Sequence, residues 1–168
     1  ASRGKVYVTV WEPETNIRAA VQISHGMAET GTRYKRFAES LTAAGYVVYA
    51  NDHLGHGQTA PNASEMGHLS KNGMMNMVSD MERLSLYILD RHPGVPLILF
   101  GHSMGSFLTQ MYIAQHGKLL DGAILCASNG PRGPELLAGV AVSRLIAGMK
   151  GWKHRSKFID NLTFGGFN

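Results

Sequence analysis

The sequence lacks several features that whole classes of protein require. It has one cysteine, Cys126, which excludes an internal disulfide and a cysteine-rich zinc site. No apolar run approaches the roughly 18 residues that a membrane-spanning helix needs. The first residues contain no apolar segment of the kind that marks a signal peptide. We therefore expect a cytoplasmic protein.

What the sequence does contain is typical of a folded domain. Its 168 residues are 44% apolar and 17% charged, which is a globular rather than a disordered composition. Charge is distributed unevenly along the chain. Residues 1–143 have equal numbers of basic and acidic residues, whereas residues 144–168 contain five Lys or Arg and a single acidic residue, Asp160. Nucleic-acid binding would need this basic segment to be joined to aromatic or groove-reading elements, which Trp152 alone does not supply, so we expect no nucleic-acid partner.

The pattern of apolar residues predicts strands that alternate with helices. Strands are expected at 5–10, 19–24, 46–50, 97–100 and 122–127, and helices at 33–44, 74–91 and 103–116. This alternation predicts an α/β fold with a mostly parallel sheet and helices on both faces. Breakers after Ser128 and an apolar helix at about 135–149 end the alternation, so we expect a core at 1–130 and a second region at 131–168.

One segment combines a motif with the context that its chemistry needs. Residues 101–105 read Gly-His-Ser-Met-Gly and lie between a predicted strand and a predicted helix. This is the arrangement of a nucleophile elbow, in which a strained turn projects a serine above the edge of the sheet. Gly105 would let the helix approach the sheet closely, and the helix N-terminus adds partial positive charge. We expect Ser103 to be a nucleophile, with a plain glycine turn as the alternative.

A nucleophile of this type needs an oxyanion hole, with one N–H group from the loop after an earlier strand. Residues 25–28, His-Gly-Met-Ala, stand at that point of the chain. The expected donors are the backbone N–H groups of Met27 and Met104. Their side chains would line an acyl pocket or pack in the core.

Four motifs in order resemble the lysophospholipase/monoacylglycerol lipase-like branch of the α/β-hydrolases. They are residues 25–29 (HGMAE), 33–34 (RY), 51–57 (NDHLGHG) and 101–106 (GHSMGS). The sequence departs from the family pattern at Thr30, where many members have His, and at residues 58–59, where Ser is frequent. The resemblance implies an α/β-hydrolase fold with the start of an inserted cap at 131–168. It also implies a serine carboxylester hydrolase of lipid-like esters, such as monoacylglycerols or lysophospholipids, without metal or organic cofactor.

The resemblance also implies that part of the site lies elsewhere. In this family the acid and the His follow the nucleophile, beyond the cap. We therefore expect the C-terminal part of the fold to be absent from this chain, with the acid and the His supplied beyond residue 168 by further sequence or by a second chain.

The eight histidines of the chain include no convincing base. His25, Gly26, Glu29 and His102 are expected to support the site, together with Gly105. Glu29 should act with Arg33 and Tyr34 to fix the oxyanion loop to the next helix. His53 and His56 are expected to be structural.

Two other functions remain open from the sequence alone. One is a different hydrolase of this fold, either a small-ester esterase or a peptidase. The other is a non-catalytic binding protein. The apolar helix at 135–149 and the basic stretch after it predict either a buried cap or a peripheral membrane contact. Cys126 is expected in a buried strand and Asp80 on a solvated helix face.

Overall fold

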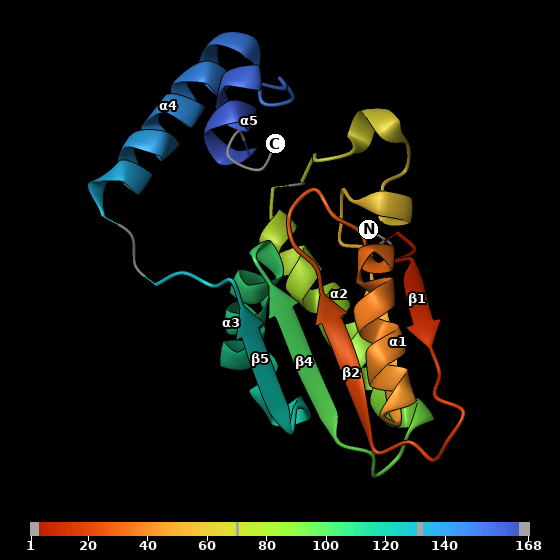
Figure 1. Ribbon diagram of the computed structural model, residues 1–168. Coiled ribbons are helices and arrows are strands. Elements are labelled where there is room, and N and C mark those ends of the chain that lie inside the picture. The colour runs from red at the N-terminus through yellow and green to blue at the C-terminus, as the bar shows by residue number, and fades with distance from the viewer. Residues whose placement is uncertain (1–3, 70, 131–132, 165–168) are drawn as a thin grey trace. The chain divides into compact units, whose positions relative to one another are not determined.

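The computed structural model describes residues 4–69, 71–130 and 133–164. The chain divides into two compact units, Ala1–Ser128 and Asn129–Asn168 (Figure 1). Within the described residues, no helix has both the length and the apolar character that crossing a membrane would take. The two units are described separately.

The first unit is built on a sheet of five strands. These are β1 (Val8–Trp11), β2 (Ala19–Ser24), β3 (Tyr46–Asn51), β4 (Leu97–His102) and β5 (Gly122–Cys126), in the order β1-β3-β2-β4-β5. β1 pairs antiparallel to β3, and the other three pairs are parallel. The mostly parallel sheet predicted from the sequence is therefore confirmed. Because β2, β3, β4 and β5 run the same way, their carboxyl ends lie along one edge of the sheet.

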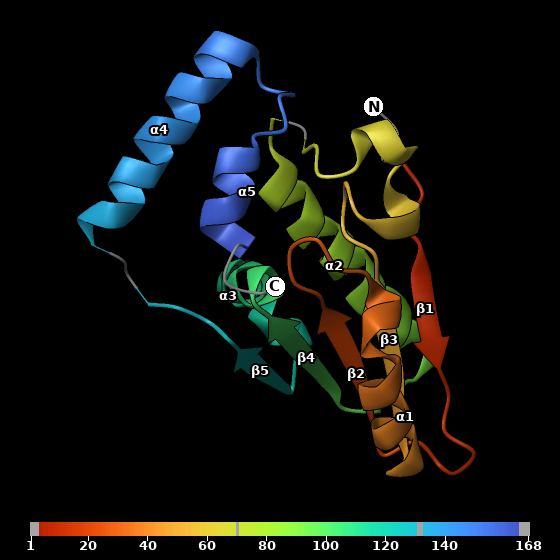
Figure 2. The same ribbon diagram turned by 45° about the horizontal axis from the view of Figure 1, so that its top comes forward.

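Helices cover both faces of this sheet (Figures 1 and 2). α1 (Lys35–Ala43) lies on one face, and α2 (Gly73–Arg91) and α3 (Met104–His116) lie on the other. Short 3₁₀ turns occupy residues 31–34, 57–59, 63–65 and 117–119. The second unit contains α4 (Pro134–Lys150) and α5 (Lys157–Phe164).

The core follows the alternation of side chains along β2. Val21 and Ile23 pack with Ala38 of α1, whereas Ala20 packs with Ile88 of α2 on the opposite face. Between them, the Gln22 side chain faces α2, where its Nε2 donates to the Met81 carbonyl at 3.0 Å. Full burial of each large apolar side chain stabilises the fold by roughly 1.5–3 kcal/mol, so these two layers hold the central strands in place.

Four expectations from the sequence are corrected. The first strand begins at Val8 rather than Lys5, and Val10 is exposed because β1 is an edge strand of the sheet that the described residues form. Asp80 is buried rather than solvated. Cys126 is exposed, because β5 is the outer strand of the described sheet. The helix predicted at 33–44 starts as a 3₁₀ turn and becomes α-helical at Lys35.

Candidate active site

Ser103 stands at the junction of β4 and α3, the strand–turn–helix context predicted from the sequence. Its backbone has φ 51° and ψ −118°, a conformation that non-glycine residues rarely adopt. The Ser103 N–H donates to the Cys126 carbonyl at 3.0 Å. The Ser103 carbonyl accepts from both the N–H and the hydroxyl of Ser106, at 2.9 and 2.6 Å. The strained turn is therefore held by contacts to β5 on one side and to α3 on the other.

The two glycines of the motif allow this junction to close. A Cβ atom on Gly105 would lie 1.9 Å from the Ser24 carbonyl oxygen of β2 and 2.7 Å from that of His25. A Cβ atom on Gly101 would lie 2.3 Å from the Thr109 hydroxyl. Only glycine fits at either position without a shift of the backbone. The contact at Gly105 brings the first turn of α3 against the loop that follows β2.

That loop is held by a hydrogen bond from the ring of His25. Its Nδ1 lies 2.7 Å from the Gly26 carbonyl, which can only accept, so Nδ1 carries the proton. The Gly26 carbonyl and the Met27 N–H belong to one planar trans peptide and point in opposite directions. Fixing the carbonyl therefore also fixes the direction of the Met27 N–H. Ala28 follows with φ 58°, a second non-glycine residue in the left-handed region.

His25 is fully buried and is held in one protonation state. Its Nε2 accepts the His53 N–H at 2.9 Å, so this nitrogen must carry a lone pair. Burial lowers the pKa of His25 below its usual value of 6.5, against the opposing effect of the bond to Gly26. Burial likewise lowers the pKa of His53 well below 6.5, and the nearby His25 and His56 add to that shift. The interior behind the loop thus favours neutral imidazoles.

Glu29 connects the loop to the elements around it. Its Oε2 accepts the Gly26 N–H at 3.1 Å and the Tyr34 hydroxyl at 2.8 Å, and its Oε1 lies 3.1 Å from Arg33 Nε. The Tyr34 hydroxyl is also 2.9 Å from Nδ1 of His102, the residue before Ser103. Burial raises the pKa of Glu29, but the bonds from Tyr34 and Gly26 and the charges of His102 and Arg33 outweigh it, so the net shift is downward. A carboxylate is therefore favoured at this position.

The two methionines differ in their surroundings. The Met27 side chain is exposed, whereas Met104 packs against the buried cluster that contains Met77, Leu99 and Leu108. The prediction that these side chains pack in the core is therefore correct for Met104. The Met27 side chain is instead exposed to solvent.

Asp52 is a residue that the sequence analysis did not assign to the site's framework. It is almost fully buried, and its two carboxylate oxygens accept the N–H groups of Gly31 and Gln58, both at 2.8 Å. A Cβ atom on Gly57 would collide with this carboxylate. Asp52 therefore ties the loop after β3 to the start of the helical segment before α1. The available signal was its place directly after the buried strand 46–51, inside the N-D-H-L-G-H-G motif.

Two other aspartates could serve as the catalytic acid on residue type alone, but both make structural contacts instead. Asp80 pairs with Arg83 at 3.4 Å on α2. Asp121 accepts the Leu97 N–H at 2.8 Å, where β4 begins, at the opposite edge of the sheet from Ser103. Among the described residues, no group of three or more His, Cys, Asp or Glu side chains is placed to hold a metal ion.

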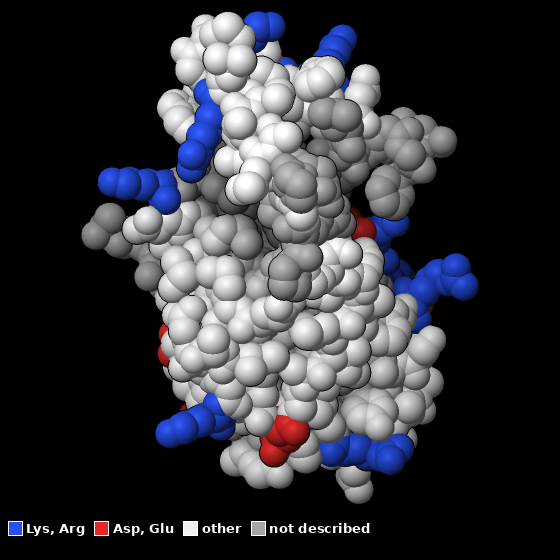
Figure 3. Space-filling model, turned by 90° about the vertical axis from the view of Figure 1, so that its left-hand side faces the viewer, with Lys and Arg blue, Asp and Glu red and all other residues white. Residues whose placement is uncertain are grey.

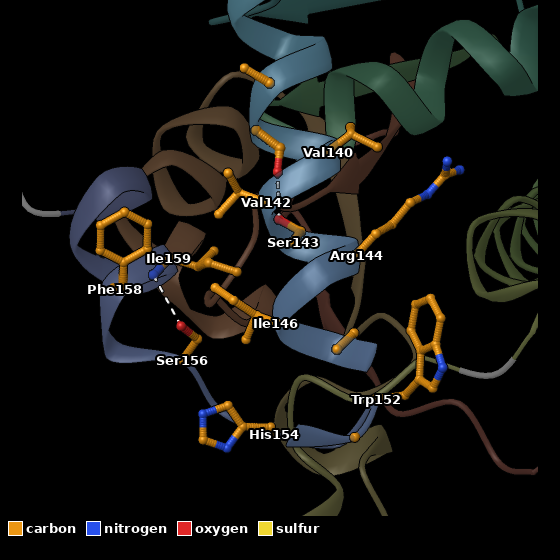
Figure 4. A pocket seen from close by; sticks show the side chains of 14 residues that line it. Val140, Val142, Ser143, Arg144, Ile146, Trp152, His154, Ser156, Phe158 and Ile159 are labelled. Carbon is orange, nitrogen blue, oxygen red and sulfur yellow. Dashed lines mark hydrogen bonds between the residues drawn. The ribbon is translucent and has the colours of Figure 1, made fainter. Parts of the chain in front are cut away.

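The second unit contains an apolar hollow of its own, of about 710 Å³. Figure 4 shows Val142 and Ile146 of α4 on the side that faces Ile159 of α5. Arg144 and Trp152 also line the hollow. The hollow is therefore lined by apolar side chains of α4 and α5 together with the cation Arg144.

The chain is similar in sequence to curated lipases. The chain is 36% identical over 131 residues to a monoacylglycerol lipase of Mycolicibacterium smegmatis, which covers 75% of this chain and 45% of the relative. It is 32% identical over 120 residues to a monoglyceride lipase homolog of Monkeypox virus, covering 71% and 42%. The chain spans about half the length of the curated relatives it matches.

The chain also superimposes on solved structures of an esterase and a lipase. A thermostable carboxyl esterase of Bacillus coagulans superimposes with a TM-score of 0.80 at 33% identity, over 94% of this chain and 51% of the esterase. A lipase in an open form superimposes with a TM-score of 0.81 at 30% identity, over 98% of this chain and 54% of the lipase. The fold is thus that of the α/β-hydrolases. A family model described as serine aminopeptidase, S33, matches residues 15–162, and the chain belongs to that family.

Proposed function

We propose that the protein is a serine hydrolase of lipid-like carboxylic esters, with monoacylglycerols or lysophospholipids as the substrate class. The observation that carries this proposal is the backbone of Ser103, held at φ 51° and ψ −118° between β4 and α3. Strain of this kind is retained where the surrounding structure supports it, and it is concentrated at functional sites. The lipase and esterase relatives support the ester class.

In the proposed reaction, Ser103 Oγ attacks the ester carbonyl carbon and its proton passes to a histidine. The carbonyl oxygen becomes an oxyanion, which the N–H groups of Met27 and Met104 stabilise. The alcohol leaves with the proton, and an acyl-enzyme remains that water then hydrolyses. Each donor of this kind contributes roughly 10²–10³-fold to the rate. The histidine and the acid that orients it are assigned to sequence beyond residue 168.

The test is Ser103→Ala in the full-length protein. It should lower the hydrolysis of a monoacylglycerol by about 10⁴-fold or more, while the thermal unfolding midpoint stays close to that of wild type. Ser40→Ala, which removes an exposed hydroxyl on α1, is the matched control and should keep wild-type activity. A fluorophosphonate probe should label Ser103 in the wild type. Full activity in a pure Ser103→Ala sample would reject the assignment.

A peptidase is the second candidate, because the matching family model is described as a serine aminopeptidase. Both reactions would use the same serine and differ in the leaving group. Rates on acylglycerols of increasing chain length, measured beside rates on aminoacyl anilides, separate the two. Faster turnover of the anilides would replace the lipid-ester proposal by the peptidase.

We further propose that the second unit contacts anionic lipid at a membrane surface. Leu145 and Met149 of α4 are 63% and 67% exposed, and Trp152 is 83% exposed. The basic residues Lys150, Lys153, Arg155 and Lys157 are also exposed and lie next to these apolar side chains in the sequence. Such a combination suits a surface of apolar tails and anionic headgroups, with about 1 kcal/mol for each basic residue near the membrane.

Co-sedimentation with vesicles tests this contact. Binding to phosphatidylserine vesicles should exceed binding to neutral phosphatidylcholine vesicles and should weaken as salt rises. Replacing Lys150, Lys153, Arg155 and Lys157 by Gln should remove the preference. The same replacement at Lys5, Arg36, Lys71 and Lys118 of the first unit is the control of equal charge. Equal binding across lipid charge, salt and variants would favour a cap helix buried over an acyl pocket.

A further inference from the structure

Three side chains from different parts of the first unit form a continuous hydrogen-bonded bridge. Glu29 Oε2 accepts the Tyr34 hydroxyl at 2.8 Å, and the same hydroxyl lies 2.9 Å from His102 Nδ1. The Glu29 side chain is 15% exposed and that of His102 is 32% exposed. The bridge is therefore partly buried, and water competes only weakly for its hydrogen bonds.

The direction of the protons along this bridge follows from valence. The phenol of Tyr34 has one proton, which it donates to Glu29, so its oxygen must accept from His102 Nδ1–H. Burial and the neighbouring Glu29 raise the pKa of Tyr34, so the phenol keeps its proton. Since Glu29 accepts as a carboxylate, its bonds to Tyr34 and to the Gly26 N–H are charge-assisted and stronger than neutral ones.

The bridge begins where the sheet stops aligning the two segments of the site. The parallel ladder between β2 and β4 ends at the pair Ser24 and Gly101. Beyond that pair the two segments no longer pair as strands, and one continues toward Met27 and the other toward Met104. Glu29 holds Gly26, the residue before Met27, and Tyr34 holds His102, the residue before Ser103. The bridge thus adds a side-chain link between the two loops, beside the packing of Gly105 against the Ser24 and His25 carbonyls.

We propose that Glu29, Tyr34 and His102 are positioning residues that set the distance between the Met27 and Met104 N–H groups. The proposal rests on the hydrolase function proposed above. Two N–H groups stabilise an oxyanion only when both lie at hydrogen-bond distance from it, and displacements of about 1 Å at a reacting centre can cost on the order of 100-fold in rate. Loss of the bridge lets the loops separate, so it weakens binding of the oxyanion and leaves substrate binding unchanged.

Tyr34→Phe in the full-length protein is the first test, because it removes the hydroxyl and keeps the ring that packs edge-on to Phe100. We expect kcat for a p-nitrophenyl ester to fall about 10-fold, with KM within two-fold of wild type. The inhibition constant of a trifluoromethyl ketone, which forms a tetrahedral oxyanion on serine, should rise by the same factor. Tyr87→Phe, at an exposed tyrosine on α2, is the matched control and should change neither value.

Glu29 offers a graded series. Glu29→Gln keeps an oxygen that can accept both bonds, so it should retain more activity than Glu29→Ala. A merely structural bridge would lower the unfolding temperature in all variants without separating kcat from KM. An unchanged kcat in Tyr34→Phe, or a loss of kcat that only follows a loss of folded protein, would overturn the proposal.

A measurement without turnover separates this proposal from the proposed function. Nitrogen NMR of labelled histidine should show His102 protonated at Nδ1, and the Gly26 amide should exchange at least ten-fold faster in Glu29→Ala than in wild type. An unprotected Gly26 amide in the wild type overturns the bridge even in an active enzyme. A wild type with this bridge intact that hydrolyses no ester overturns the hydrolase function and with it the positioning role.

Discussion

Strands β2 and β5 have similar apolar sequences and opposite surroundings. All six residues of β2 are buried, whereas four of the five residues of β5 are exposed. β2 lies between β3 and β4 and has a helix on each face, while among the described strands β5 pairs with β4 alone. Figure 3 looks onto the side of the first unit where β5 and α3 lie, and the centre of that surface carries few charged side chains. Composition thus predicts a strand, but its neighbours in the sheet decide whether it is buried.

The largest effect is expected where α3 meets the end of β2. Gly105→Ala would place a Cβ atom 1.9 Å from the Ser24 carbonyl oxygen, so the helix or the strand must move. We expect a loss of several kcal/mol in the free energy of unfolding, on the order of 3–5 kcal/mol. Urea denaturation measures it. Gly117→Ala, where a Cβ atom meets an ordinary contact at 3.5 Å, is the control and should change the free energy of unfolding little. Equal stability of the two variants would show that the junction is loose.

A pair of matched substitutions tests the comparison of the two strands directly. Ile23 of β2 is fully buried, whereas Ile124 of β5 is 51% exposed. Ile23→Ala should lower the free energy of unfolding by about 3 kcal/mol, since it leaves a cavity. Ile124→Ala should cost about 0.5 kcal/mol or less. A cost at Ile124 as large as that at Ile23 would mean that another chain segment or a second copy covers β5 in solution.

The smallest effect is a dependence of stability on pH that originates behind the end of β2. The pKa values of His25 and His53 are lower in the folded protein than the usual 6.5 of an unfolded chain. The unfolded state therefore binds more protons as pH falls below about 6.5. The neutral histidines contribute their full stabilisation above that pH, and the free energy of unfolding decreases as pH falls toward the folded-state pKa values. Protonated His25 would also point Nε2–H at the His53 N–H, while Asp52 and Glu29 partly offset its charge.

Urea midpoints between pH 7.5 and 5 check this expectation. His154→Asn, at an exposed histidine of the second unit, is the control and should keep the wild-type profile. Midpoints that stay level across this range would contradict neutral histidines in the interior.

Local patterns made most of the fold predictable. The alternation of strands and helices and the Gly-x-Ser-x-Gly context depend on residues close in the sequence, and the structure has them within a few positions. The exposure of Cys126 was not predictable, because it depends on which strands pair with β5. The bond between Tyr34 and His102 joins residues 68 positions apart. Asp52 belonged to a recognised motif, but its two bonds to backbone N–H groups follow only from the packing of that loop.

Residues in an unfavourable backbone region lie in the loops that follow three neighbouring strands. Ala28, Ser103 and Ala127 follow β2, β4 and β5 with φ of 58°, 51° and 51°. Each costs on the order of 1–3 kcal/mol relative to an ordinary conformation, and it persists because the surrounding structure holds it. The loops are thus the part of the first unit whose native conformation is least stable. A destabilising substitution elsewhere in the unit would relax these loops first. A partly destabilised protein can therefore keep its far-ultraviolet circular dichroism after it has lost its catalytic activity.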